Sequence, residues 1–253
     1  MKVTYRGKQF AAKREIVRLE GNLFLFENDV EVTDSILVPH VSGPTSILSH
    51  LLVESGGGTI EYGRSSHPMA DNVVVYLPKN SFVLLKTSKI KVKIVNYCSV
   101  DDLCDSKRPF CFTADSFQPL RSLSYIQTYL MDRARQCFHD DGISNVALEM
   151  KRYIDEIYQD ECRLGEFRKN VSRGTLTYHF KKDFGIAPKE YLNRLRVIAS
   201  MYDLVSGKTI TESAHRNGFS DISRYYKNFK KFSHVPPGDY HNKLKGLRKS
   251  PKS

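Results

Sequence analysis

The feature that most constrains this 253-residue chain is a repeat with an offset of 49 residues in its C-terminal half. The segment FKKDFGIAPKEY at 180–191 returns as FKKFSHVPPGDY at 229–240, so that Phe-Lys-Lys, Pro and Tyr recur in register. A basic stretch with a periodic apolar pattern precedes each Phe-Lys-Lys. We therefore expect two equivalent helical units, each with one helix that ends at its lysine pair.

The second unit shows the pattern of a helix-turn-helix most clearly. Thr209–Glu212 has the S/T-x-x-E form of a capping box and predicts the start of a short helix. Gly218 predicts a tight turn, and a new helix is expected from about Asp221 to Lys231. In a helix-turn-helix the second helix enters the major groove of DNA, so we call this second helix of each unit the reading helix.

The first unit is expected from Leu164 to Asp183, and its reading helix begins at the N-cap residue Ser172. Gly174 lies inside that helix and weakens it by about 1 kcal/mol relative to Ala. A long helix, about Lys189 to Ser206, carries a continuous apolar stripe and connects the two units.

The charge distribution points to the same half of the chain. The net charge is +11. Residues 144–253 hold 22 Lys and Arg against 12 Asp and Glu, whereas residues 1–143 hold 17 against 16. A basic domain joined to a nearly neutral one is typical of a protein that binds a polyanion. For the last lysines and arginines of the chain, a plain solvated tail is the alternative.

With these motifs in place, the chain resembles the AraC/XylS family of bacterial transcription regulators. The residues that carry the resemblance are Phe180-Lys181-Lys182, Gly185, Pro188, Tyr191, Leu195-Arg196, Ile210, Ala214, Gly218-Phe219-Ser220, Ser223, Phe229-Lys230-Lys231, Pro237 and Tyr240. The chain departs from the family in two places. His234 stands where the family usually has Gly, and the first helix of the first unit, 164–168, is short and lacks the usual Ala.

The resemblance implies a sequence-specific regulator that binds double-stranded DNA, acts as an activator, is not an enzyme and uses no cofactor. Its two reading helices would reach adjacent major-groove segments about 34 Å apart. RNA polymerase is an implied partner, and regulation of virulence or stress genes an implied role. A homodimer and a small-molecule effector stay open as further partners.

The candidate DNA contacts lie on and near the reading helices. They are of two kinds, because phosphate contacts position a protein and base contacts specify the sequence. The expected base-reading residues are Arg173, Thr177, Tyr178, Asp221, Ser223, Arg224 and Lys227, and the family resemblance implies Gly174 as a further base-reading position. The expected phosphate contacts are Lys181, Lys182, Arg196, Lys230 and Lys231. Arg224 suits guanine O6 and N7. For Lys227 a phosphate contact is the alternative, and for Arg196 a salt bridge within the protein.

The N-terminal half reads as β-rich over residues 1–112. Strands are expected at 22–32, 47–53, 59–62, 73–77, 82–85 and 90–94, because short apolar or alternating runs are separated there by Gly, Pro, Asn and Ser. Asp71–Asn80 resembles the strand and turn of cupin-like barrels. The expected fold class is α+β, with a degenerate cupin-like β-barrel followed by an all-α domain of two helix-turn-helix units joined by a linker helix.

Four segments follow from these patterns. Residues 1–115 form the cupin-like regulatory domain, 116–143 a linker or dimerisation-type helix, 144–245 the DNA-binding domain and 246–253 a basic tail. The helix at 119–139 has one apolar face that packs under the barrel or against a second copy of itself. A further helix is expected at 144–160.

Two other classes of protein are weighed against the regulator. A cupin-type metal enzyme needs converging ligands, but His40, His50 and His67 are scattered without an H-x-H, so no metal site is expected. A structural nucleoid protein would bind DNA with little sequence preference. The five cysteines lack a CxxC and no run is long enough for a membrane helix, so we expect a cytoplasmic protein without membrane contact. Lys86 or Arg64 is a candidate for holding a carboxylate effector.

Overall fold

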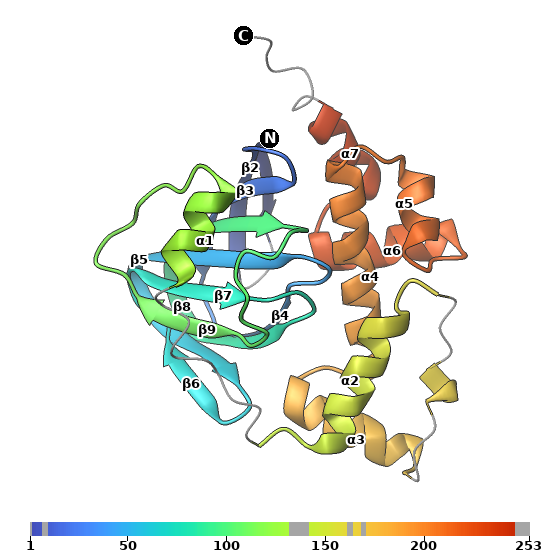
Figure 1. Ribbon diagram of the computed structural model, residues 1–253. Helices are drawn as coiled ribbons and strands as arrows, with labels where there is room; N and C mark the ends of the chain where they lie inside the picture. Colours follow the sequence, from blue (N-terminus) through green and yellow to red (C-terminus); the bar gives the residue numbers. More distant parts are fainter. Residues whose placement is uncertain (1, 7–9, 132–141, 161–163, 168–170, 246–253) are drawn as a thin grey trace. The chain divides into compact units, whose positions relative to one another are not determined.

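The computed structural model describes residues 2–6, 10–131, 142–160, 164–167 and 171–245. The chain divides between residues 141 and 142 into two compact units, a sheet-rich one and a helical one (Figure 1). The mixed architecture predicted from the sequence is therefore confirmed.

The sheet-rich unit is built on two long neighbouring strands in the middle of its sheet. They are β5 (Ser46–Tyr62) and β8 (Phe82–Ser99), paired antiparallel along most of their length. The other strands are β1 (Lys2–Arg6), β2 (Phe10–Arg18), β3 (Leu23–Val32), β4 (Ile36–Val41), β6 (Ser65–Pro68), β7 (Val73–Leu77) and β9 (Phe110–Thr113). The order is β1-β2-β3-β8-β5-β7-β9, with β4 paired to β8 and β6 to β5.

Each long strand changes its outer partner halfway along. The first half of β8 pairs with β4 and the second half with β3, while β5 pairs first with β7 and then with β6. The change is possible because β5 bends at Gly56–Gly58, where its register against β8 shifts. Gly56 has φ of +78°, and a Cβ there would overlap the carbonyl oxygen of Lys89. Glycine is required at this bend because the two backbones approach each other so closely.

Two expectations about this unit need correction. The runs predicted as separate strands at 47–53 and 59–62 belong to β5, and those at 82–85 and 90–94 belong to β8. Glycine, Ser and Lys residues between these runs mark bends inside continuous strands rather than strand ends. The second correction concerns the barrel, which is not closed: within the described residues, the sheet runs from an edge at β1 to an edge at β9 without a pairing between them.

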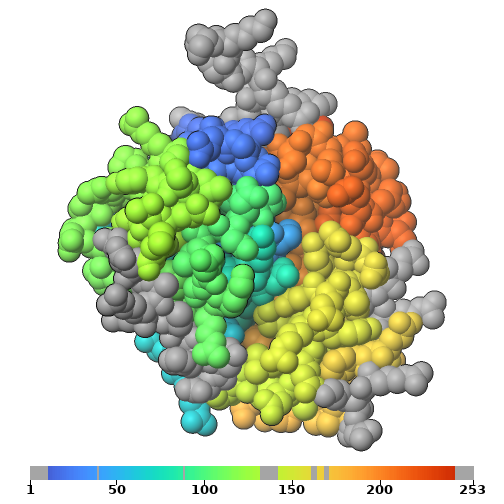
Figure 2. Space-filling model, viewed as in Figure 1, coloured from blue at the N-terminus to red at the C-terminus, as the bar shows by residue number. Residues whose placement is uncertain are grey.

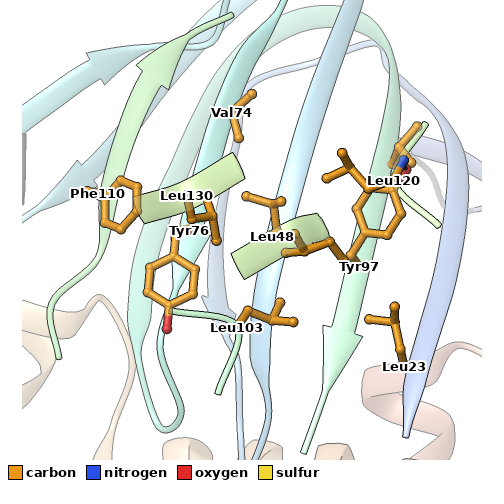
Figure 3. Close-up of a cluster of buried hydrophobic side chains, with 11 residues drawn as sticks. Leu23, Leu48, Val74, Tyr76, Tyr97, Leu103, Phe110, Leu120 and Leu130 are labelled. Carbon is orange, nitrogen blue, oxygen red and sulfur yellow. Dashed lines mark hydrogen bonds between the residues drawn. The ribbon is translucent and has the colours of Figure 1, made fainter. Parts of the chain in front are cut away.

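One face of the sheet is covered by α1 (Leu123–Met131) and by the segment before it. These residues form part of the surface that faces the viewer in Figure 2. Ile126 and Leu130 of this helix are fully buried and pack with Leu48, Tyr76 and Tyr97 of the strands (Figure 3). The Tyr97 hydroxyl accepts a hydrogen bond from the backbone N–H of Leu120, which fixes the approach to the helix. The apolar face of α1 is thus used against the sheet. The predicted helix at 119–139 starts later than expected, because residues 119–122 are not helical. Residues 132–139 lie outside the described residues.

The helical unit is organised around its longest helix, α4 (Pro188–Val205). In Figure 1, α2 (Asn145–Ile157) and α3 (Arg173–Phe184) lie toward one end of α4. The helices α5 (Ile210–Arg216), α6 (Ile222–Ser233) and α7 (Pro237–Lys245) lie toward its other end. The 3₁₀ turn η1 (Leu164–Glu166) stands between α2 and α3. The helices predicted at 144–160, 172–183, 189–206 and 221–231 are confirmed to within a few residues.

Two hydrogen-bonded networks tie the helices to α4. Asp155 of α2 accepts a hydrogen bond from the Tyr191 hydroxyl of α4 at 2.7 Å and one from Lys151 at 2.6 Å. Burial raises the pKa of Asp155, although both of these partners act in the opposite direction. On the other half of α4, Asp203 accepts from Asn217 at the end of α5 at 2.8 Å. The long helix α4 therefore holds a partner helix on each half through a carboxylate.

The bend in β5 gives a stability prediction with a control in the same triplet. Gly56→Ala and Gly58→Ala should each lower the free energy of unfolding of the sheet-rich unit by about 1–3 kcal/mol, because a Cβ would overlap the carbonyl oxygen of Lys89 or Lys86. Gly57→Ala is the control, since its Cβ would lie 3.6 Å from the nearest atom, the Met69 carbonyl oxygen. Urea unfolding checks this, and equal losses at all three positions would contradict it.

Candidate nucleic-acid interface

The two reading helices, α3 and α6, begin in the same way. Ser172 caps α3 by accepting a hydrogen bond from the Thr175 N–H at 3.1 Å, and Asp221 caps α6 by accepting from the Ser223 N–H at 2.8 Å. These N-cap residues are 49 positions apart, the offset of the sequence repeat. A side-chain acceptor at this position satisfies one of the free N–H groups at the start of a helix. The repeat in sequence is thus a repeat of helix starts.

The two helices also end alike. Gly185 follows α3 with φ of +71°, and His234 follows α6 with φ of +63°. In each case the backbone N–H of the cap residue donates to the carbonyl of the first lysine in the pair, Lys181 or Lys230, at 2.9 Å. His234 stands where the first unit has Gly185, and the structure shows the same left-handed cap at both positions. A side chain makes this conformation less favourable by about 1–2 kcal/mol.

The aromatic residues of the repeat form equivalent buried contacts. The rings of Phe180 and Tyr191 lie 5.6 Å apart, and those of Phe229 and Tyr240 lie 5.5 Å apart. All four side chains are buried, as is Phe219. These contacts attach each reading helix to the helix that follows it, so the aromatic residues of the repeat belong to the core.

The outer face of α6 carries most of the residues expected to contact DNA. Ser223, Arg224 and Lys227 are exposed, and so is Lys230 toward the C-terminal end of the helix. Lys231 is also exposed, but its ammonium lies 3.9 Å from the Glu190 carboxylate of α4. Asp221 differs from the others because its carboxylate oxygen Oδ1 caps the helix. We therefore assign it first a structural role at the helix start.

The outer face of α3 is different in composition. Gly174, Thr177 and Tyr178 are exposed, and Tyr178 keeps 63% of its surface accessible. Lys181 and Lys182 follow in the last turn and are exposed as well. The structure thus exposes these five expected residues of α3, with the lysine pair at the same end as in α6. Arg173, also expected to read bases, instead has its guanidinium against the backbone of Gly165 in η1.

Sequence reasoning missed one exposed residue of α6. Tyr226 keeps 39% of its surface accessible and is the equivalent of Thr177 at the offset of 49. The repeat could have revealed Tyr226, because its counterpart Thr177 was already a candidate for base reading. Thr175, the counterpart of Arg224, is also exposed, but its hydroxyl lies 2.9 Å from the Ser172 hydroxyl at the N-cap.

Arg196 is a correction, because it lies inside the helical unit rather than at its surface. Its side chain is buried, Nε donates to the carbonyl of Tyr158 at 2.6 Å and Nη2 donates to the carbonyl of Asp160 at 2.6 Å. The guanidinium also lies over the Phe219 ring, 5.8 Å from its centre. A guanidinium held this way satisfies carbonyls at the end of α2, so a phosphate contact is not its role.

The structure describes less of the first helix-turn-helix than of the second. Where the second unit has α5, the described part of the first shows η1. Residues 161–163 and 168–170 lie outside the described part of the chain. In the second unit, Thr209 caps α5 by accepting from the Glu212 N–H at 3.2 Å, and Gly218 takes φ of +72° in the turn.

Three further observations concern other classes of site. Among the residues that the structure describes, no three His, Cys, Asp or Glu side chains gather where they could hold a metal ion. Cys98, Cys104 and Cys111 are free thiols, while Cys137 and Cys162 lie outside the described residues. No helix in the described ranges is both long and apolar enough to span a membrane.

Comparison with known proteins agrees with the geometry of the helical unit. Residues 168–243 match the family model described as a helix-turn-helix domain. An uncharacterized HTH-type transcriptional regulator of Staphylococcus aureus (strain MSSA476) is 30% identical over 105 residues, 40% of this chain and 14% of that protein. The chain carries an AraC-type helix-turn-helix domain.

Two other similar proteins extend this comparison. An uncharacterized response regulatory protein of Staphylococcus epidermidis is 28% identical over 133 residues, 51% of this chain and 46% of that protein. The solved structure of a probable AraC family transcriptional regulator from Rhodopseudomonas palustris is 17% identical, with a TM-score of 0.37, over 40% of this chain and 98% of that one. The chain spans less than half the length of both curated relatives.

The buried position of Arg196 gives a second prediction. Arg196→Met should lower the free energy of unfolding of the helical unit by about 2–4 kcal/mol, because two carbonyls at the end of α2 lose a charged donor. Arg196→Lys should recover little, since an ammonium cannot reproduce the two-armed geometry. Chemical unfolding measures the loss. If Arg196→Met leaves stability unchanged and weakens DNA binding, the result would instead support the original prediction that Arg196 contacts a phosphate.

Proposed function

We propose that this protein regulates transcription by binding double-stranded DNA at specific sequences with α3 and α6 in adjacent major-groove segments. The observation that carries the proposal is the structural equivalence of the two helices. Both are capped, packed and ended alike at an offset of 49 residues, and both present exposed polar residues from a common support, α4. Two helices held on one long helix suit two groove segments one helical turn apart.

The positions of uncharged and charged residues along each helix support this arrangement. The exposed residues of the first two turns, such as Thr177 on α3 and Arg224 on α6, are proposed to read base edges. The lysines of the last turn, such as Lys181 and Lys230, are proposed to contact phosphates. Phosphate contacts give affinity that falls steeply with salt, whereas base contacts give specificity. The basic excess of residues 144–253 supports the same partner.

A structural nucleoid protein is the competing function, and the composition of the reading helices favours a specific reader over it. A protein that binds only the backbone needs cations, whereas α3 exposes Gly174, Thr177 and Tyr178 where the groove would lie. Uncharged residues at these positions gain little from phosphates but are suited to base edges.

The direction and control of regulation are further parts of the proposal. We propose an activator that contacts RNA polymerase, with the sheet-rich unit responding to a small ligand or a partner, including a second copy of the chain. A groove of about 880 Å³ at the bend of β5 is lined by Ile36, Leu37 and Lys86. The Lys86 ammonium lies 2.6 Å from the Glu61 carboxylate, so a carboxylate effector at Lys86 would share the ammonium with Glu61 or displace it.

Two exposed residues of α6 separate reading from anchoring. Arg224→Ala should reduce binding to a matched site by about 1–3 kcal/mol with little change on a scrambled site, because it removes base contacts. Lys230→Ala should weaken both sites alike and reduce the salt slope by about 1, because it removes a phosphate contact. Fluorescence anisotropy at several salt concentrations measures both effects.

The matched site comes from selection of random duplexes by the full chain. Both variants change exposed residues, so their unfolding curves should overlay that of the parent. Equal losses on matched and scrambled DNA for Arg224→Ala would assign it to the backbone and support the nucleoid alternative.

A further inference from the structure

The two reading helices are equivalent in structure but differ in chemistry at equivalent positions. At the offset of 49, Gly174, Thr177 and Tyr178 of α3 correspond to Ser223, Tyr226 and Lys227 of α6. We call the first set the α3 stripe and the second set, together with Arg224, the α6 stripe. All seven residues are exposed. The α3 stripe has no charge, and the α6 stripe has two cations.

The cation next to the α3 stripe in sequence is directed elsewhere. Arg173 is the first residue of α3, and its guanidinium lies against the backbone of Gly165 in η1, where a Cβ on Gly165 would overlap Nη2. The guanidinium is therefore placed against the turn that precedes the helix. The next cations along α3 are Lys181 and Lys182 in its last turn.

The groups that remain on the α3 stripe suit the thymine methyl group. Thr177 offers a methyl, Tyr178 offers a ring with 63% of its surface accessible, and Gly174 has no side chain to keep the helix away from the bases. Apolar contact with the C5 methyl is how such side chains distinguish thymine in the major groove. A glycine permits close approach of the backbone.

The groups on the α6 stripe suit guanine. Arg224 carries a planar fork of donors, and guanine presents the two acceptors O6 and N7 in the major groove. Lys227 and Ser223 add donors on the same helix, and Tyr226 lies beside them with 39% of its surface accessible. The α6 stripe thus presents mainly donors, and the α3 stripe mainly apolar groups.

From this difference we infer that the two half-sites are chemically unlike: the α3 half-site contains thymines recognised by their C5 methyl groups, and the α6 half-site contains guanine recognised at N7 and O6. The inference rests on the proposed function, because it takes both helices to enter the major groove. It states that the target DNA is asymmetric, with a different base class at each end.

The experiment removes single atoms or groups from the DNA. The full chain first selects a site from random duplexes, and deoxyuridine then replaces each thymine, or 7-deazaguanine each guanine, one at a time. Loss of a contacted thymine methyl should weaken binding about fourfold, from about 0.8 kcal/mol per buried methyl-sized group. Loss of the guanine N7 at the Arg224 contact should weaken binding about five- to tenfold.

Matched variants assign each effect to its helix. The double variant Thr177→Ser, Tyr178→Ala should lose the sensitivity to deoxyuridine and keep the sensitivity to 7-deazaguanine. Arg224→Ala should show the reverse. Both variants change exposed residues, so unfolding curves that overlay the parent serve as the control for folding.

The outcomes separate this inference from the proposed function. Failure to select any preferred duplex would overturn the proposed function itself. Selection of a site that tolerates every deoxyuridine and 7-deazaguanine substitution would leave a specific DNA-binding protein and overturn the inference. The inference is also overturned if Arg224→Ala abolishes the sensitivity to deoxyuridine, because the thymine contacts would then belong to α6.

Discussion

The buried guanidinium of Arg196 is the interaction on which the arrangement of the helical unit depends. From the middle of α4 it donates to the carbonyls of Tyr158 and Asp160, which follow the end of α2, and it packs over the Phe219 ring. A Cβ on Gly218 would lie 2.8 Å from its Nη2. One side chain therefore joins α2, α4 and the turn of the second helix-turn-helix. Burying a charge is costly unless it is hydrogen-bonded, so these partners favour the observed arrangement of the three elements.

The sheet-rich unit depends on a steric constraint instead. β5 and β8 remain paired through a bend because Gly56 and Gly58 leave room for the carbonyls of Lys89 and Lys86. The bend lets each long strand hold two partners on one side, so short strands are collected into one sheet. The apolar face that this creates is closed by Ile126 and Leu130 of α1. In both units, shorter elements are therefore held in place by packing or pairing with long ones, which are β5 and β8 in the first unit and α4 in the second.

The repeat made the helical unit predictable from sequence, because local signals agreed with one another. Caps at Ser172 and Thr209, the turn at Gly218 and the apolar stripe of α4 each specify local structure, and each was found where it was expected. The strands were less predictable, since Gly56–Gly58 has the composition of a turn and serves as a bend. Tyr226 was missed although its counterpart Thr177 was named, because its exposure depends on how α6 packs.

The sequence by itself determined approximately where the helices of the C-terminal half start and stop, that two reading helices with equivalent ends exist, and that the basic charge lies with them. These properties follow from side chains that act on their own backbone or on neighbours within a few residues. Only the tertiary structure showed that Arg196 is buried and that the Arg173 guanidinium lies against Gly165 of η1. It also showed that the described strands form a sheet without a pairing between β1 and β9. The position of Arg196 and the open sheet depend on residues distant in sequence, because burial and long-range pairing are properties of the packed chain. The contact of Arg173 depends on how the chain folds back at η1.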